Sequence, residues 1–346
     1  EDPACEIRQI DETMIPVFDP AAPAASGCVA TPPLVSVCMT AYNHAPYIGR
    51  AIEGVLSQRT TFAVELVLSD DCSTDGTGAI CRDYAARYPD RIRLLTGDVN
   101  VGMRANYRRT IEACRGRYVA MCDGDDWWCD PLKLQRQVEA LEADPACGIC
   151  YTRVRCYAQE EGRYVENYPM GAGATTFEEL LLNNTIPNCA AVVRRDLLAG
   201  YYADPELRPL ERPWPLEDYP MWLWMAPRCT IRFLDCETAV FRVLSDSGSH
   251  QSSLERRIVY FDAIFDIKCW FDARYGGGRQ RRRIARMRME YILTLMRDAG
   301  GGACLRRWWR DVRREPSLLF VWRGGGKLVW SALRRSARHE FLNGNR

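Results

Sequence analysis

From residue 34 onward, short apolar runs alternate with segments in which apolar residues recur every three or four positions. The runs have the length of buried strands and occupy residues 34–39, 64–68, 92–95 and 118–122. Helical spacing fills the intervals between them, at residues 48–56, 76–88 and 105–114. Repeated strand–helix–strand units predict an α/β fold, with a mostly parallel sheet and helices on both of its faces.

Beyond residue 131 the pattern is mixed, and no internal repeat is visible. Helices are predicted at residues 134–141, 221–225 and 254–265, and strands at 148–157, 188–193 and 230–234. Thr176 and Glu179 have the spacing of a capping box, which predicts the start of a further helix. We therefore expect an extension or linker at 1–33, one α/β domain at 34–275, and a basic helical region at 276–346.

Polar residues follow three of the predicted strands. They are the stretches Thr40-Ala41-Tyr42-Asn43, Ser69-Asp70-Asp71 and Asp123-Gly124-Asp125-Asp126. In open α/β sheets, ligands bind beyond the carboxyl ends of the strands, so the three stretches should converge on one crevice.

The third stretch places three carboxylates at the end of a buried strand, where their charge needs a partner. A divalent cation is the natural one, and oxygen ligands suit Mg²⁺ or Mn²⁺. Gly124 would let the backbone approach a ligand closely. The alternative is an acidic turn that caps the next helix, for which Asp130 and Pro131 are suitable residues.

Charge is distributed unevenly along the chain. Residues 279–346 hold 18 Lys and Arg against 5 Asp and Glu, whereas the remainder holds 28 against 40. This asymmetry predicts an anionic partner for the basic part.

Sixteen cysteines are scattered along predicted strands and helices, and only Cys147 and Cys150 form a C-x-x-C pair. We expect them to be reduced and mostly buried, as in a cytoplasmic protein. No apolar run reaches the length of a transmembrane helix, and the acidic first residues do not predict a signal peptide.

The ordered motifs resemble glycosyltransferase family 2, whose members have the GT-A fold. The resemblance rests on residues 35–43 (VSVCMTAYN), 69–77 (SDDCSTDGT), Asn100-Val101-Gly102 with Asn106, and 123–126 (DGDD), and it covers roughly residues 34–250. It implies a nucleotide-diphosphate sugar donor, with a uridine nucleotide expected, and Mn²⁺ or Mg²⁺ as cofactor.

The resemblance also implies residue roles on the donor side. Thr40 and Tyr42 would line the nucleotide pocket, and Asp71 would contact the base. Asp123 would contact the ribose or the metal, and Asp125 would bind the metal at the diphosphate. A cation there would stabilise the negative charge that develops on the leaving group.

An inverting transfer also needs a general base for the acceptor hydroxyl. Family members carry this base in a Glu-Asp pair before an apolar helix. Glu217 and Asp218 match the pair, so the resemblance implies Asp218 as the base. The alternative is that Asp218 only caps the N-terminus of the helix. Arg242 and His250 fall where the family has a phosphate-side loop. Leu244 occupies the position of the family's metal-binding histidine, so ligation by His250 stays open, beside a purely structural role.

Further pocket residues are expected from their positions. Trp127 and Trp128 follow the acidic stretch, and we expect one to pack in the core and the other to line the sugar or acceptor pocket with Glu217. Arg104 would reach the nucleotide or the acceptor, unless it is a solvated residue at a helix start.

The basic region interleaves arginine clusters with tryptophan, at residues 306–310, 318–323 and 328–330. Such segments suit an anionic membrane surface, and no nucleic-acid module is recognised. The alternative is a solvated helical bundle. Membrane contact would place the protein on the inner face of the cell membrane, where it would meet a lipid-linked acceptor.

Together these observations predict an inverting, metal-dependent glycosyltransferase of surface polysaccharide biosynthesis, acting on a glycan or lipid-linked acceptor. The family alone suggests the polysaccharide. Two rivals remain: a nucleotidyltransferase on a similar sheet, and a nucleotide-sugar-binding protein without catalysis.

Overall fold

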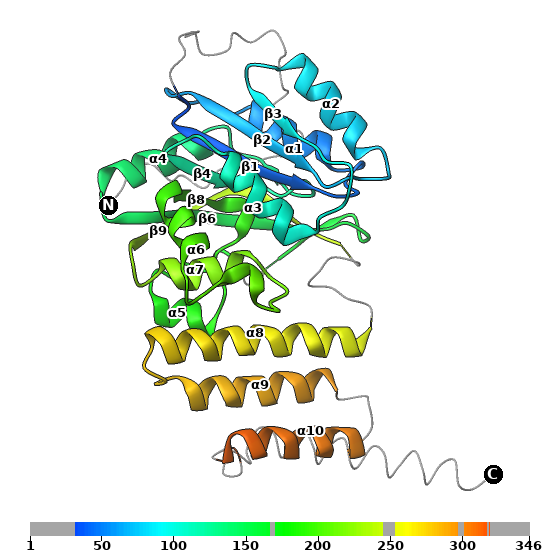
Figure 1. Ribbon diagram of the computed structural model, residues 1–346, viewed down its shortest axis with the longest axis vertical. Coiled ribbons are helices and arrows are strands. Elements are labelled where there is room, and N and C mark those ends of the chain that lie inside the picture. The colour runs from blue at the N-terminus through cyan, green and yellow to red at the C-terminus, as the bar shows by residue number, and fades with distance from the viewer. Residues whose placement is uncertain (1–31, 167–169, 245–252, 297–300, 317, 319–346) are drawn as a thin grey trace, which may run out of the picture. The chain divides into compact units, whose positions relative to one another are not determined.

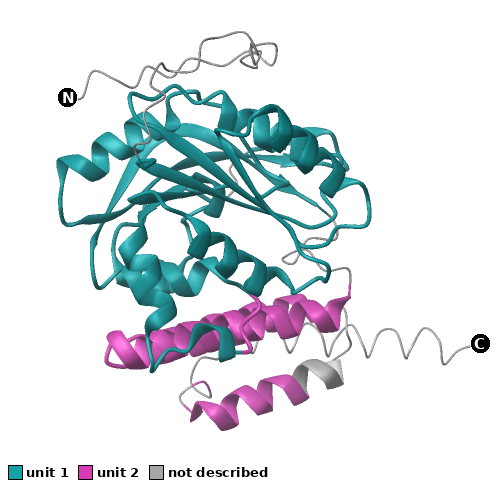
Figure 2. Cartoon of the chain, turned by 45° about the horizontal axis from the view of Figure 1, so that its top comes forward, with its two compact units in different colours: residues 1–212, 216–244 teal, residues 213–215, 245–346 magenta. Residues whose placement is uncertain are grey.

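The structure is a computed structural model that describes residues 32–166, 170–244, 253–296, 301–316 and 318 (Figure 1). The chain divides into two compact units, shown in Figure 2. The first comprises residues 1–212 and 216–244, and the second comprises 213–215 and 245–346. Compactness groups residues 254–275 with the C-terminal helices rather than with the α/β domain, and the predicted domain boundaries stay a prediction.

Within the described residues, nine strands form one sheet in the order β3-β2-β1-β4-β8-β6-β9-β5, with β7 beside β6. The first four strands are parallel: β1 (Val35–Ala41), β2 (Val64–Asp70), β3 (Ile92–Leu95) and β4 (Tyr118–Met121). Helices connect them: α1 (Ile48–Leu56), α2 (Thr77–Arg87) and α3 (Met103–Ala113). The strand order runs outward from β1 to β3 and then returns to β4. Right-handed crossovers therefore place α1 and α2 on one face and α3 on the other.

The second half of the sheet is mixed. Its strands are β5 (Trp127–Trp128), β6 (Cys147–Ala158), β7 (Arg163–Val165), β8 (Ala191–Arg194) and β9 (Thr230–Val243). β8 runs antiparallel to both β4 and β6, whereas β6 and β9 are parallel. The predicted α/β fold is confirmed, and its parallel part is concentrated in the first four strands.

Helical segments fill the connections of this half. They are α4 (Lys133–Ala143), α5 (Phe177–Leu182), α6 (Arg195–Ala203) and α7 (Asp218–Met225), with short 3-10 turns η1 (Asn188–Ala190) and η2 (Pro209–Glu211). The capping box at Thr176 and Glu179 is present. The strand predicted at 188–193 begins only at Ala191, because the N–H of Ala190 closes a turn onto the carbonyl of Pro187.

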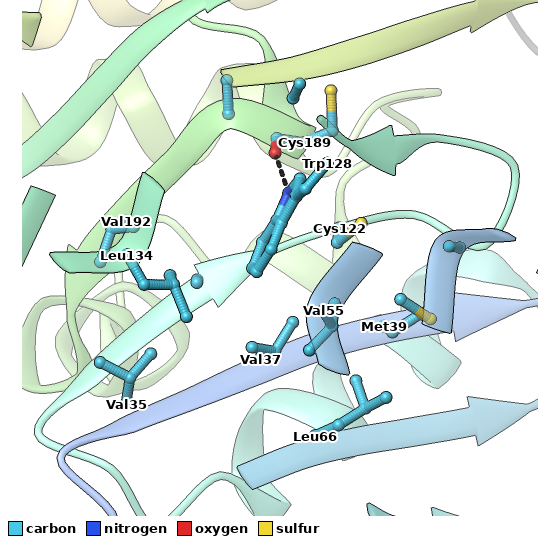
Figure 3. Close-up of a cluster of buried hydrophobic side chains, with 14 of the residues drawn as sticks. Val35, Val37, Met39, Val55, Leu66, Cys122, Trp128, Leu134, Cys189 and Val192 are labelled. Atoms are coloured by element: carbon cyan, nitrogen blue, oxygen red, sulfur yellow. Dashed lines mark hydrogen bonds between the residues drawn. The ribbon is translucent and has the colours of Figure 1, made fainter. Parts of the chain in front are cut away.

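The main core lies between the sheet and the helices α1 and α4 (Figure 3). Alternate residues of β1 and the apolar stripes of both helices contribute to it: Val35, Val37, Met39, Ile48, Ala51, Ile52, Val55, Leu134, Val138 and Leu141. Burying one such aliphatic side chain contributes about 1.5–3 kcal/mol for the larger residues. Among the cysteines whose side chains the structure describes, eight are buried.

The second unit contains α8 (Leu254–Tyr275), α9 (Arg281–Leu295) and α10 (Gly301–Arg314). Asp262 of α8 accepts hydrogen bonds from Arg288 of α9 at 2.9 Å and from Arg307 of α10 at 2.6 Å. Charged residues inside this unit therefore tie its three helices together. No helix in the described part of the chain combines the length and the hydropathy that crossing a membrane requires.

Gly54 of α1 sets how closely that helix approaches β5. A Cβ atom at Gly54 would lie 2.9 Å from both the backbone nitrogen and the carbonyl oxygen of Trp128. We expect Gly54→Ala to destabilise the fold by roughly 1–3 kcal/mol through overpacking against backbone that cannot move aside.

Gly49→Ala in the same helix is the matched control. Its Cβ would meet only the Tyr84 hydroxyl at 3.7 Å, so we expect no loss, or a gain of up to about 1 kcal/mol from helix propensity. Urea unfolding of both variants measures the difference. If Gly54→Ala and Gly49→Ala had the same free energy of unfolding, the claim that α1 packs too closely on β5 to admit a Cβ at Gly54 would be wrong.

Candidate active site

Three parallel strands end side by side, and backbone hydrogen bonds hold their ends together. The N–H of Gly124 donates to the carbonyl of Thr40 at 2.9 Å, and the N–H of Asp71 donates to that of Ala41 at 3.0 Å. The loops after β1, β2 and β4 therefore meet at the carboxyl edge of the sheet, where the strand order reverses between β1 and β4. The convergence expected from the sequence is present.

Gly124 makes its close approach to the chain itself. A Cβ at this position would lie 3.0 Å from the carbonyl oxygen of Thr40 and 2.9 Å from Nδ1 of His44. This glycine therefore has a packing role, since it lets the turn after β4 close onto the end of β1, and the close approach of a ligand here stays a prediction.

Asn43 and Asp75 connect the loops after β1 and β2. The N–H of Asn43 donates to Oγ of Ser73 and its side-chain oxygen accepts from the N–H of Thr74, both at 2.9 Å. Asp75 accepts from the N–H of Ala45 at 2.9 Å. Asn43 has a φ of 56°, which asparagine tolerates better than most residues. Sequence reasoning missed these roles; the only signal was that Asn and Asp often bond to nearby backbone.

Asp71 organises the loop that begins α3. Its carboxylate accepts from the N–H of Val101 at 3.0 Å and from that of Gly102 at 2.9 Å, and the side chain is buried. A carboxylate has about four lone-pair positions, so acceptor capacity remains for a further donor. Tyr42 is 46% exposed on the neighbouring loop.

Asp123 lies at the end of β4 among polar neighbours. It accepts from Nδ2 of Asn188 at 2.8 Å and lies 3.5 Å from Oγ1 of Thr40. The pKa of Asp123 is raised to about 7, mainly by burial and next by the negative charge of Asp125. The hydroxyl of Tyr107 donates to Asn188 at 3.1 Å and so orients its amide. Asn188 was not singled out in the sequence.

Asp126 and Arg242 close the acidic turn. Oδ1 of the buried Asp126 accepts from the backbone N–H of Arg242 at 2.7 Å. The Arg242 guanidinium donates from Nε to the carbonyl of Asp125 at 2.7 Å, and from Nη1 to Gln159. Burial, followed by the charges of Asp125 and Asp123, raises the pKa of Asp126 well above its usual value. Asp126 therefore fixes the turn to the backbone of β9.

The two tryptophans have different environments. Trp128 belongs to the core and donates from Nε1 to the carbonyl of Cys189 at 2.7 Å (Figure 3). Trp127 has two guanidinium groups close to its ring, with Cζ atoms 3.9 Å (Arg50) and 4.6 Å (Arg242) from the ring centroid. Both indoles are buried. Trp128 takes the packing role, and contact of Trp127 with a sugar stays a prediction.

Asp218 is the first residue of α7. Burial raises the pKa of this carboxyl to about 6, although hydrogen bonds from backbone N–H groups and from Asn184 oppose the rise. Its negative charge is also one of the causes that raise the pKa of Asp123. The two carboxylates, distant in the sequence, therefore share one electrostatic environment.

Glu217 and Arg104 form a largely buried ion pair. Nε of Arg104 donates to Oε2 of Glu217 at 2.8 Å, and the hydroxyl of Tyr202 donates to Oε1 at 2.9 Å. The alternative of a solvated Arg104 is therefore wrong. Contact of either residue with the donor or the acceptor is not tested by this arrangement.

Asp125 is the carboxylate best placed for a cation. It is partly exposed, and no described side chain or backbone group donates a hydrogen bond to its carboxylate. Mg²⁺ and Mn²⁺ are commonly held by one or two carboxylates together with substrate phosphates and water. Asp125 and Asp123 fit that donor set. Among the described residues no group of three His, Cys, Asp or Glu side chains could enclose a metal, and His250 lies outside them.

The fold and the acidic turn define the class of protein. The structure resembles residues 1–349 of S. aureus TarS in complex with UDP-GlcNAc, with a TM-score of 0.52, 17% identity, and coverage of 76% of this chain and 80% of that chain. It also resembles the mannosyltransferase PcManGT of Pyrobaculum calidifontis, in complex with GDP-Man and Mn²⁺, with a TM-score of 0.50, 16% identity, and coverage of 89% and 88%. At these identities the likeness concerns the fold, which is GT-A as expected.

Sequence comparison gives the family. The profile of Glycosyl transferase family 2 matches residues 36–201. The chain is 30% identical to EpsE of Bacillus subtilis over 247 residues, covering 68% of this chain and 84% of EpsE. It is 32% identical to TuaG of the same organism, named for teichuronic acid biosynthesis, over 51% of this chain and 68% of TuaG. The chain belongs to glycosyl transferase family 2.

A third relative, an uncharacterised protein of Mycobacterium tuberculosis, is 38% identical over 162 residues. That match covers 46% of this chain and 47% of the mycobacterial relative, so the chain spans about half the length of that relative.

Proposed function

We propose that this protein transfers a sugar from a nucleoside diphosphate donor to a hydroxyl group of a glycan or lipid-linked acceptor, with inversion at the anomeric carbon. The observation that carries the proposal is the carboxyl edge at which β1, β2 and β4 end together, with the carboxylates of Asp123 and Asp125 in the turn after β4. The charge of Asp218 also acts on Asp123, since it is one of the causes that raise the pKa of that carboxyl. A metal-dependent inverting transferase needs this pair of functions, a charge-stabilising side and a basic side.

The donor nucleotide would bind at the joined ends of β1, β2 and β4. Thr40 and the exposed Tyr42 would line its pocket, and Asp71 would use its remaining acceptor capacity for the base. Asp123 would contact the ribose or the metal. Arg242 would support the diphosphate from the turn that it already closes. The nucleotide sugars bound by TarS and PcManGT support a donor of this class.

Asp125, with Asp123, would hold a divalent cation, Mn²⁺ or Mg²⁺. Such an ion supplies electrostatic stabilisation of the leaving diphosphate. A contribution from His250 remains part of the proposal. The turn that carries Asp123 and Asp125 is held in place by the hydrogen bond from the backbone N–H of Arg242 to Asp126.

Asp218 would remove the proton of the acceptor hydroxyl. A carboxyl with a pKa near 6 is mostly ionised at neutral pH, yet it is a stronger base than an ordinary aspartate. The acceptor oxygen would attack the anomeric carbon from the face opposite the diphosphate. Trp127 and Glu217 would border the acceptor side.

The acceptor class is inferred from relatives. TuaG is named for teichuronic acid biosynthesis, and a further relative, ExoO of Rhizobium meliloti, for succinoglycan biosynthesis. A growing surface polysaccharide is therefore the acceptor that we propose. Residues 34–275 would form the catalytic domain.

The basic C-terminal region would bind the anionic inner face of the cell membrane. On α10, exposed residues recur on one face, at Arg306, Trp309, Arg310 and Arg313, whereas Arg307 and Val312 are buried. An indole between guanidinium groups suits the boundary of headgroups and acyl chains. The interleaved segments at 319–323 and 328–330 lie outside the described residues.

Asp125→Asn should abolish the dependence of donor binding on Mn²⁺, because the neutral amide lacks the negative charge that binds the cation. Calorimetric titration of UDP and GDP, with and without Mn²⁺, measures the effect. Asp126→Asn is the matched control, since its amide oxygen can still accept from Arg242, and it should keep the dependence. Equal behaviour of the two variants would exclude Asp125 as the principal ligand.

Asp218→Asn should keep donor binding and lose turnover by roughly 10²–10⁴-fold, the usual contribution of a general base. The measurement is a screen of nucleotide sugars with Mn²⁺ that follows release of nucleoside diphosphate. Release of pyrophosphate instead would indicate a nucleotidyltransferase. A parent protein that binds donors but turns none over would be a binding protein only.

Arg306, Arg310 and Arg313, changed together to Glu, should lower binding to vesicles that contain phosphatidylglycerol. Changing Arg59, Arg87 and Arg163 to Glu alters the net charge equally and should leave that binding intact. Co-sedimentation of both variants, with neutral phosphatidylcholine vesicles for comparison, measures this. Equal loss in both variants would rule out a specific face on α10.

A further inference from the structure

One arginine fastens the segment that leads into Asp218 to the start of α3. Arg104 is the second residue of that helix. Its Nε donates to Glu217 at 2.8 Å, its Nη1 to the carbonyl of Arg212 at 2.6 Å, and its Nη2 to the carbonyl of Pro209. A single planar guanidinium group thus holds three acceptors within residues 209–217.

Glu217 is held from a second direction as well. Tyr202 of α6 donates its hydroxyl to Oε1 at 2.9 Å, while Arg104 occupies Oε2. The carboxylate is only 4% exposed. Both oxygens are therefore engaged inside the protein, and Glu217 is not free to accept a proton from an acceptor. Its neighbour Asp218, which starts α7, is fixed through it.

The same start of α3 carries the loop on the donor side. Asp71 binds the N–H groups of Val101 and Gly102, the residues that lead into α3 just before Arg104. The loop assigned to the nucleotide and the segment that bears the base therefore share one rigid connection through Arg104.

We propose that Arg104 and Glu217 are positioning residues that set the place of the Asp218 carboxylate relative to the donor. This inference rests on the proposed function. An inverting attack needs base, acceptor oxygen and anomeric carbon in one geometry, and a misplacement of about 1 Å can reduce the rate on the order of 10²-fold. Neither residue touches a reacting atom in this role.

The chemistry of arginine is essential to the proposal. A lysine at position 104 would keep the charge, but an ammonium group is a point charge that cannot reproduce the fixed fork of three donors. Arg104→Lys therefore separates loss of geometry from loss of charge. Glu217→Gln removes the charge but keeps the size, and Tyr202→Phe removes one hydrogen bond alone.

The chain offers a matched control at the start of β4. Arg117 donates to Glu142 at 3.0 Å, and the hydroxyl of Tyr118 donates to the same carboxylate at 2.6 Å. This group has the same three side-chain types as Arg104, Glu217 and Tyr202, is more exposed, and lies at the opposite end of the strand from the acidic turn. Arg117→Lys and Glu142→Gln should leave catalysis unchanged.

The experiment measures three quantities for each variant: kcat with the nucleotide sugar that the parent protein turns over, the Kd for UDP or GDP in the presence of Mn²⁺, and Tm. We expect Arg104→Lys and Glu217→Gln to lower kcat by roughly 10- to 100-fold while Kd changes less than about threefold. The double variant should lose no more than the worse single variant, because the two residues act as one unit.

Two outcomes would overturn the inference, and they are distinct. If the parent protein turns over a donor and the variants keep its kcat, the positioning role is wrong and the proposed function stands. If the parent turns over no donor, the proposed function fails and the inference fails with it. Should the Arg104 variants not fold, Tyr202→Phe carries the test, and an unchanged kcat in that folded variant counts against positioning.

Discussion

The concentration of negative charge at the end of β4 is the constraint around which the site is organised. Asp123, Asp125 and Asp126 lie within one turn, and each of the two more buried carboxyls has a raised pKa because water is excluded and its neighbours are negative. Hydrogen bonds from Asn188 and from the backbone of Arg242 offset only part of this cost. Such a turn suits a cation and a diphosphate better than a purely structural role.

The surrounding structure keeps that turn in place. Gly124 allows it to close onto the end of β1, and Arg242 holds it from β9. Trp127, which directly follows the turn, has the guanidinium groups of Arg50 and Arg242 close to its ring. The acidic turn is thus supported by strands from both halves of the sheet.

The base of the proposed function comes from a different part of the chain. Asp218 begins a helix whose leading segment is attached to α3 through Arg104. Because α3 also starts at the loop bound by Asp71, the proposed donor side and the proposed base share a common support. Both are held by elements that the core orders, rather than by isolated loops.

The alternation of apolar runs and helical stripes was sufficient to predict β1 to β4 and the meeting of their ends, because periodicity and crossover rules depend on local pattern. The same pattern failed at residues 188–190, where a turn closed by Pro187 delays the strand. It also could not show that β8 runs antiparallel, since strand direction depends on partners distant in the sequence.

The sequence by itself determined the residue types of the site: the acidic turn, the Asp71 loop and the Glu217-Asp218 pair. Only the tertiary structure decided their partners. It paired Arg104 with Glu217, Asn188 with Asp123, and the backbone of Arg242 with Asp126. The physical reason is that a buried charge takes whichever donors the packed chain brings within about 3 Å, and those donors come from elements with no fixed spacing in the sequence.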